Sequence, residues 1–97
     1  MNVSREQFAK VRQALNGLIG NRLDKVLLIK HIDRLIEGIG LDYTYIHIVN
    51  ETDIYDFEDY RIDFALEGCN IIGSIWYLKT RNKNKPYYIT EISVDNG

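Results

Sequence analysis

The stretch YRIDFALEGCNIIGSIWYLK, residues 60–79, decides the fold because it holds two strand patterns separated by a turn. Four apolar residues alternate with polar or small ones in its first part: Tyr60, Ile62, Phe64 and Leu66. This alternation is typical of a strand with one buried and one wet face. The glycine-marked residues 68–70 predict a turn, and residues 71–79 are apolar in both phases. The second strand is therefore expected to be central in its sheet or covered on both sides.

One further strand is predicted before this pair in the sequence and one after it. Residues 43–49, YTYIHIV, are rich in β-branched and aromatic side chains. A polar loop at 80–86 leads to a last strand at 87–94, and Pro86 fits its start, where the ladder loses no donor. If helices cover one face only, residues 71–79 leave Trp76 or Tyr77 on the open face as a candidate interface.

The first half of the chain has helical periodicity. Ser4, with Gln7 three residues later, is a capping-box signature, and Asn21 with Asp24 predicts the start of a second helix in the same way. The apolar stripe of the second helix is the broader of the two, so this helix is expected to be more buried. Its members are Val26, Leu27, Ile29, Ile32, Leu35, Ile36 and Ile39.

The order of elements is thus α-α-β-β-β-β. Runs of helix followed by runs of strand indicate an α+β fold. We expect an N-terminal helical hairpin packed on one face of a four-stranded antiparallel meander, in a single domain covering residues 1–97.

Composition limits the function classes. The 97 residues carry 12 basic and 14 acidic side chains, so a generally basic nucleic-acid binder is disfavoured. The N-terminus, MNVSREQFAK, lacks the apolar run of a signal peptide, and no stretch is long enough to span a membrane. With one cysteine, Cys69, a disulfide framework is excluded and a cytoplasmic location is expected. Abundant Ile, Asn, Lys and Tyr, whose codons are AT-rich, indicate a low-GC bacterium or a phage or mobile element within one.

Acidic residues are concentrated in ETDIYDFEDYRID, residues 51–63. This stretch holds six acids and one base, whereas the rest of the chain has 11 basic and 8 acidic residues. Extending the phase of Tyr60 backwards would bury Asp56 and Glu58, which is very costly. Either the strand begins near Asp59 after a long loop over 50–58, or a β-bulge near Glu58 or Asp59 reverses the phase. The bulge is favoured because it turns Tyr55 and Phe57 inward.

The acids then form an outward negative ridge along one hairpin. One interpretation is a solvated face that keeps the sheet edge from aggregating. The functional interpretation is a surface that docks on a basic partner, such as a nuclease or another nucleic-acid-binding host protein, by imitating nucleic acid. The predicted contact residues are Asp53, Tyr55, Asp56, Glu58, Asp59, Tyr60 and Asp63.

Other chemistry-bearing residues offer alternatives. The loop segment KTRNKNK carries four cations that could contact phosphates: Lys79, Arg81, Lys83 and Lys85. The same loop could meet the acidic ridge of a second copy in a homodimer. A small enzyme would be built round His47 with Glu51, Asp53 or Cys69, although a structural histidine is the commoner case. The acids lack the glycine and terminal glutamate of a calcium-binding EF-hand loop, and neither a metal nor a cofactor is expected.

The leading prediction is a small acidic protein-binding module without catalysis. Inhibitors of this kind, of the anti-defence or anti-CRISPR type, are made by phages and mobile elements, and this step is an analogy. The first alternative is a nucleic-acid-binding protein that uses the basic loop. The second is a toxin-immunity protein or a small enzyme around His47.

Overall fold

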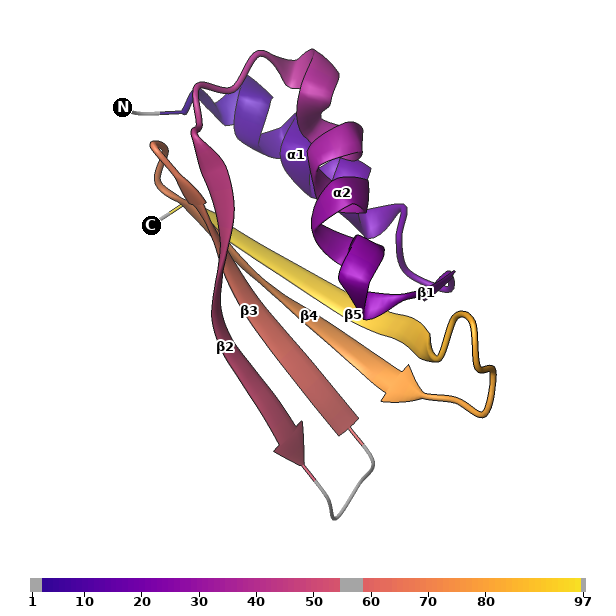
Figure 1. Ribbon diagram of the computed structural model, residues 1–97. Helices are drawn as coiled ribbons and strands as arrows, with labels where there is room; N and C mark the ends of the chain where they lie inside the picture. The colour runs from indigo at the N-terminus through magenta and orange to yellow at the C-terminus, as the bar shows by residue number, and fades with distance from the viewer. Residues whose placement is uncertain (1–2, 55–58, 97) are drawn as a thin grey trace.

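The computed structural model describes residues 3–54 and 59–96, with side chains for all of these except residues 25, 26, 50–54 and 59. Within these ranges the chain forms two α-helices, one short 3-10 helix and five strands (Figure 1). The helices are α1 (Arg5–Asn16), α2 (Lys25–Ile36) and the 3-10 helix η1 (Glu37–Ile39). The strands are β1 (Arg22–Leu23), β2 (Tyr45–Ile54), β3 (Asp59–Glu67), β4 (Ile71–Lys79) and β5 (Tyr87–Asn96).

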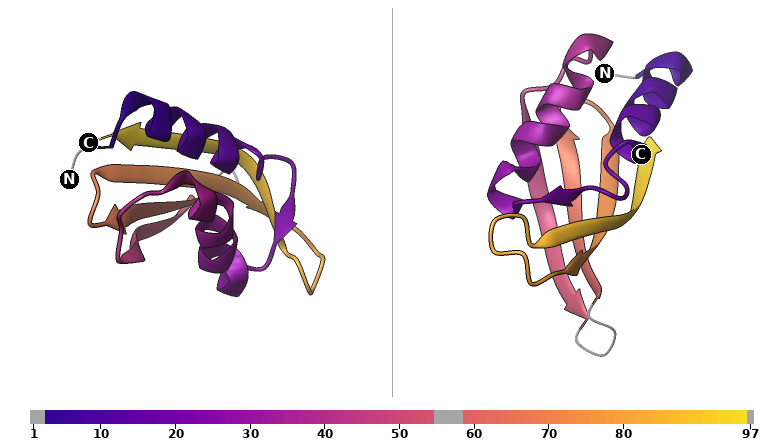
Figure 2. Two further views of the ribbon diagram at one scale, coloured as in Figure 1. Left: turned by 90° about the horizontal axis from the view of Figure 1, so that it is seen from above. Right: turned by 90° about the vertical axis from the view of Figure 1, so that its right-hand side faces the viewer.

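The described strands form one antiparallel sheet in the order β1-β5-β4-β3-β2. Both helices lie on the same side of this sheet, as the right-hand view of Figure 2 shows. The predicted α+β class and the meander from β2 to β5 are therefore confirmed. The predicted count of four strands is wrong by one, because Arg22 and Leu23 pair with Tyr88 and Tyr87 at the outer edge of β5.

The short strand β1 is held by the turn that precedes it. Gly20 has a φ of 86°, a left-handed conformation that suits glycine. Its N–H donates to the Ile89 carbonyl at 2.8 Å, and the Ile89 N–H donates to the Asn21 carbonyl at 3.0 Å. These two bonds extend the β1–β5 pairing into the turn and fix the start of α2 beside β5.

Helix α1 begins as predicted. The Ser4 hydroxyl accepts from the Gln7 N–H at 3.1 Å, and the Gln7 side chain accepts from the Ser4 N–H at 3.2 Å. Both bonds of the capping box satisfy N–H groups that a helix N-terminus leaves unpaired. Val11 and Leu15 are fully buried against the sheet side of the molecule.

Helix α2 differs from its prediction in start and in buried face. Asn21 does not begin it; the Asn21 amide donates instead to the Gly17 carbonyl at 2.8 Å, and the helix starts at Lys25. The buried stripe consists of Leu28, Ile32 and Ile36. Several members of the predicted broad stripe are exposed by about two fifths: Leu27, Ile29 and Leu35.

Strand β4 is central, as expected, with β3 and β5 on its two sides. Ile71, Ile75 and Tyr77 face the helices and are buried. The helices cover only this face, so Ile72 on the opposite face is 48 % exposed. Of the two aromatic residues considered for the open face, Trp76 lies there half-buried, whereas Tyr77 belongs to the core.

The inward phase of β3 is also confirmed, since Ile62, Phe64 and Leu66 are buried and Tyr60 is half-buried. The strand begins at Asp59, as the less favoured alternative had it, but the long loop over 50–58 in that alternative is wrong for 50–54, which belong to β2. A register irregularity does occur in this hairpin, on β2 between Ile48 and Asn50. The favoured bulge near Glu58 or Asp59, with Tyr55 and Phe57 inward, depends on residues 55–58, which lie outside the described residues. From Asp59 onward β3 pairs regularly with β4.

Candidate functional site

The acidic segment lies largely on paired strands. β2 and β3 pair without interruption from Asn50 opposite Asp63 to Ile54 opposite Asp59, and Asp53 lies opposite Tyr60. β2 is at the edge of the sheet, so its outer side carries no neighbouring strand among the described residues. Three of the predicted contact residues, Tyr55, Asp56 and Glu58, lie outside the described residues, as do the side chains of Asp53 and Asp59.

The two predicted contact residues with described side chains lie on opposite faces of β3. Tyr60 faces the helix side, where its ring stacks on Tyr77 with centroids 5.3 Å apart. Tyr77 in turn meets Tyr87 edge-on at 4.7 Å. Tyr60 is thus engaged in a row of three tyrosines across β3, β4 and β5, which anchors this end of the sheet.

Asp63 lies on the open face and is engaged by its neighbours. It accepts a hydrogen bond from the Ser74 hydroxyl at 2.6 Å. The Nε of Arg61 is buried without an aligned hydrogen bond and lies 3.2 Å from the Asp63 carboxylate. Glu67, at the far end of the same face, lies 3.1 Å from Nδ1 of His47. Both of these carboxylates on β3 therefore already have local partners.

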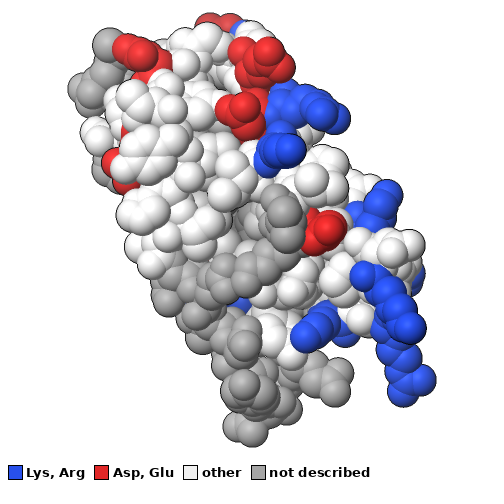
Figure 3. Space-filling view, viewed as in Figure 1, with Lys and Arg blue, Asp and Glu red and all other residues white. Residues whose placement is uncertain are grey.

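The basic loop between β4 and β5 is internally ordered. The Asn82 side chain accepts from the backbone N–H groups of Asn84 and Lys85, both at 3.0 Å. All four predicted phosphate-contacting residues are exposed: Lys79, Arg81, Lys83 and Lys85. Figure 3 shows basic side chains gathered along the side of the molecule where this loop lies.

Arg22 also belongs to this basic region, although the sequence analysis did not predict it. It lies opposite Tyr88 because β1 pairs with β5. A two-residue strand has no periodicity of its own, so the only sequence signal was the glycine-marked turn before it.

One row of paired residues shows how the charges are distributed. Ile54, Asp59, Leu78, Tyr88 and Arg22 lie opposite one another in turn across the whole sheet. The acidic and basic segments therefore share one end of the sheet (Figure 1). From β2 to β1 there are four inter-strand spacings of about 4.8 Å, roughly 19 Å in all. This distance exceeds the Debye length of about 8 Å at physiological salt. Salt therefore screens the attraction between acids on β2 and Arg22, and Arg22 does little to neutralise them.

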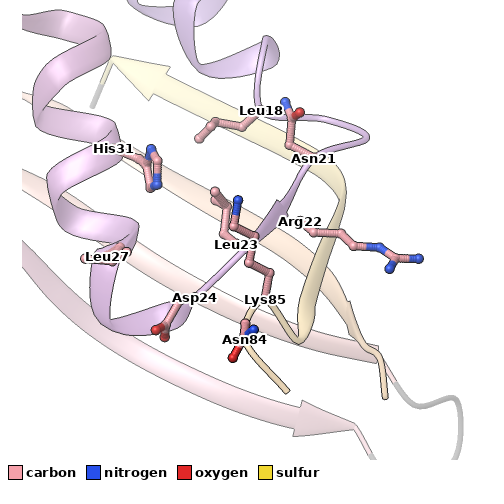
Figure 4. A pocket seen from close by; sticks show the side chains of 9 residues that line it. All are labelled: Leu18, Asn21, Arg22, Leu23, Asp24, Leu27, His31, Asn84 and Lys85. Carbon is pink, nitrogen blue, oxygen red and sulfur yellow. The ribbon is translucent and has the colours of Figure 1, made fainter. Parts of the chain in front are cut away.

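A hollow of about 340 Å³ lies beside the basic region (Figure 4). It is formed where the α1–β1 turn, β1, α2 and the β4–β5 loop converge. Its lining residues are Leu18, Asn21, Arg22, Leu23, Asp24, Leu27, His31, Asn84 and Lys85.

His47, the centre of the enzyme alternative, is exposed on the open face of β2. Its ring contacts Glu67 and lies 6.2 Å from the Tyr45 ring, and it is not among the residues that line the hollow beside the basic region. Cys69 lies in the β3–β4 turn, where its thiol contacts the Leu66 carbonyl at 3.7 Å. The structure does not bring these two residues together through any contact in its described part.

Two further properties concern metals and membranes. In the described ranges, no three His, Cys, Asp or Glu residues are grouped as metal ligands would be. Neither α1 nor α2 has the length and apolar character that a membrane-spanning helix requires.

Comparisons with known proteins gave no match: no family model fits the chain, and neither a curated protein nor a solved structure is significantly similar to it. Function is therefore inferred from the geometry.

Proposed function

We propose that this protein is a binding module without catalysis, which docks its β2–β3 hairpin on a basic surface of a protein partner. The observation that carries the proposal is the pairing of β2 with β3 as far as Ile54 and Asp59. It puts Glu51, Asp53 and Asp59 on a regular ribbon at the edge of the sheet. Acids on a paired ribbon keep fixed mutual positions, which a basic surface can match at a lower entropic cost than acids on a loose loop.

The position of the ribbon supports docking in a second way. Arg61 is the one base within residues 51–63, and it already lies against Asp63. The basic loop leaves from β4 and β5, farther across the sheet. Glu51, Asp53 and Asp59 therefore lie near one edge of the sheet, where their negative charge attracts a cationic partner and speeds association.

We further propose that docking inhibits the partner, because the hairpin imitates nucleic acid and occupies the partner's binding surface. Successive residues on one face of a strand are about 6.8 Å apart. The phosphates of a single nucleic-acid strand follow one another at a rise of about 3.4 Å. Carboxylates on one face of a strand therefore repeat their negative charge at about every second phosphate step. A nuclease or another nucleic-acid-binding protein of a host cell would offer the complementary basic channel. Binding would block that channel without chemistry.

The test compares three forms of the protein as bait in cell lysate at low salt. The hairpin variant carries Asp56→Lys, Glu58→Lys and Asp59→Lys. The control variant carries Glu37→Lys, Asp42→Lys and Glu91→Lys, three exposed acids outside the hairpin, and so has the same net charge. We expect a partner that the wild type and the control retain and the hairpin variant loses. Its binding should weaken as salt rises and under competition by an oligonucleotide. Retention by the folded hairpin variant would contradict the proposal.

The basic loop supports a second candidate, direct nucleic-acid binding. Arg22 beside the loop adds a fifth cation at the same edge. The measurement is fluorescence anisotropy of a labelled single-stranded oligonucleotide, with an Arg81→Glu, Lys83→Glu variant. Binding by the wild type that the variant loses would favour this candidate over the hairpin. A wild type that binds no oligonucleotide would exclude it.

A further inference from the structure

The hollow beside the basic loop is built by contacts between segments far apart in the sequence. The Gly20 and Asn21 backbone bonds to Ile89 hold the α1–β1 turn against β5. The Asn82 side chain fixes the backbone of Asn84 and Lys85 on the other side. Helix α2 closes the third side with Leu27 and His31. The walls are thus held by hydrogen bonds and by secondary structure, and the hollow does not depend on a ligand to form it.

The walls of the hollow are apolar in part. Leu18 and Leu23 are 6 % exposed, and Leu27 is 42 % exposed on the side of α2 that borders the hollow. His31 is half-buried and points toward the interior of the hollow in Figure 4. A volume of about 340 Å³ lies near the lower end of the range of about 300–1,000 Å³ found for small-molecule sites. The space therefore suits a compact ligand with an apolar body.

Lys85 gives the hollow a positive charge. In Figure 4 its side chain runs from the β4–β5 loop between β1 and α2, and its amine ends on the side where Leu18 and His31 lie. Among the described residues it makes no ion pair. Asp24 lies at the opposite end of the hollow, whereas the Arg22 side chain points away from it (Figure 4). The hollow thus has the ammonium of Lys85, an exposed residue, next to its apolar walls, and Asp24 at its other end.

We propose that this hollow binds a small organic monocarboxylate with an apolar body. The carboxylate accepts hydrogen bonds from the Lys85 ammonium and from an N–H of His31, and the body lies against Leu18, Leu23 and Leu27. A ligand with a single negative charge matches the single ammonium group of Lys85 better than a phosphate dianion does. This site is separate from the acidic hairpin and does not depend on the function proposed for it.

The test uses hexanoate as the probe and nuclear magnetic resonance of the ¹⁵N-labelled whole chain. Hexanol, which has the same body without charge, and acetate, which has the charge without the body, are the control ligands. Lys85→Met removes the charge and keeps an apolar stem. Lys83→Met makes the same change two residues away, on a side chain that does not line the hollow.

We expect hexanoate to shift amide signals of residues 18–27 and 85 in the wild type, more strongly than hexanol or acetate at equal concentration. Lys85→Met should weaken hexanoate binding at least tenfold, and Lys83→Met should leave it unchanged. The proposal is overturned by any of three results: hexanoate shifts none of these signals at millimolar concentration, hexanol binds as well as hexanoate, or the two lysine variants lose binding equally.

Discussion

The Phe64 ring lies over the backbone of Gly73, its partner on the neighbouring strand. The two residues are paired across β3 and β4, and a Cβ atom at Gly73 would lie 2.5 Å from Cζ of Phe64 and 2.7 Å from its Cε1. Phe64 is 1 % exposed and is among the largest fully buried side chains. Glycine is therefore required here for space, since its backbone has no positive φ. Glycine is tolerated in the middle of β4 because the Phe64 ring of β3 fills the space that a side chain at position 73 would occupy.

Substitution of Gly73 by alanine should destabilise the protein. The new methyl group must displace a ring that is packed on all sides, and overpacking of this kind costs about 1–3 kcal/mol. Urea denaturation followed by tryptophan fluorescence measures the loss, and Trp76 on the same strand is the only tryptophan in the sequence. An unchanged midpoint for Gly73→Ala would show that the ring moves freely.

Two variants separate crowding from the general effect of replacing glycine. Gly38→Ala is the matched control, since a Cβ atom there would meet nothing within 4 Å. We expect its free energy of unfolding to stay within about 0.5 kcal/mol of the wild type. Phe64→Leu destabilises alone but makes room for the methyl group that Gly73→Ala adds. A double-mutant cycle should therefore give a favourable coupling between positions 64 and 73.

The capping box at the start of α1 should contribute measurably to stability. Ser4→Ala removes the acceptor of the Gln7 N–H and should cost about 1 kcal/mol. In a domain of this size that lowers the melting temperature by about 4–8 °C. Ser4→Asp keeps an acceptor at the same place and serves as the control, with an expected melting temperature close to that of the wild type. Equal losses in the two variants would argue against a capping role.

Local sequence patterns predicted much of this fold, because these elements depend on interactions between residues that are close together in the sequence. The boundaries of β4 at Ile71 and Lys79 follow from a long apolar run ended by polar residues. The start of α1 follows from Ser4 and Gln7, whose side chains bond to nearby backbone. The inward phase of β3 follows from strict alternation, which leaves one arrangement without buried charge.

The missed features have causes that lie far apart along the chain. β1 forms because Arg22 and Leu23 pair with the outer edge of β5. A stretch of two residues is too short to show the alternation of a strand. The exposure of Leu27 and Ile29 depends on how α2 is rotated about its own axis, which turns Leu28 toward the sheet instead. In the candidate site, the outward direction of Asp63 was predictable from its phase. Its engagement by Ser74, 11 residues away, was not, because it required the register of β3 and β4.

Loss of the Asp63 carboxylate should destabilise the sheet more than loss of an exposed ion pair. Asp63→Ala leaves the buried Nε of Arg61 without its neighbouring charge and the Ser74 hydroxyl without its acceptor. Stranding such groups costs about 1–3 kcal/mol. Lys10→Ala removes the exposed pair with Glu6, whose two side chains are 59 % and 82 % exposed, and should cost no more than about 0.5 kcal/mol. Equal costs in urea denaturation would contradict the structural role of Asp63.

Tyr43 should make stability fall at high pH. Its phenol donates to the Asp33 carboxylate, and burial, followed by this bond, raises the pKa of Tyr43 to about 12. A tyrosine in the unfolded chain ionises near pH 10. Because the folded pKa is the higher one, the stabilisation is complete below about pH 10 and is lost as pH rises toward 12.

The measurement is the free energy of unfolding of the wild type and of Tyr43→Phe at about pH 8 and about pH 11. The wild type should be the more stable protein at the lower pH. The difference should shrink at the higher pH, because only the wild type gains from ionising residue 43 in the unfolded chain. Absorbance at the phenolate band gives an independent check, since the variant should lack the tyrosine that titrates near pH 12. A difference in stability that stays constant between the two pH values would show that residue 43 ionises alike in the folded and unfolded chains. The bond to Asp33 would then have no influence on its proton.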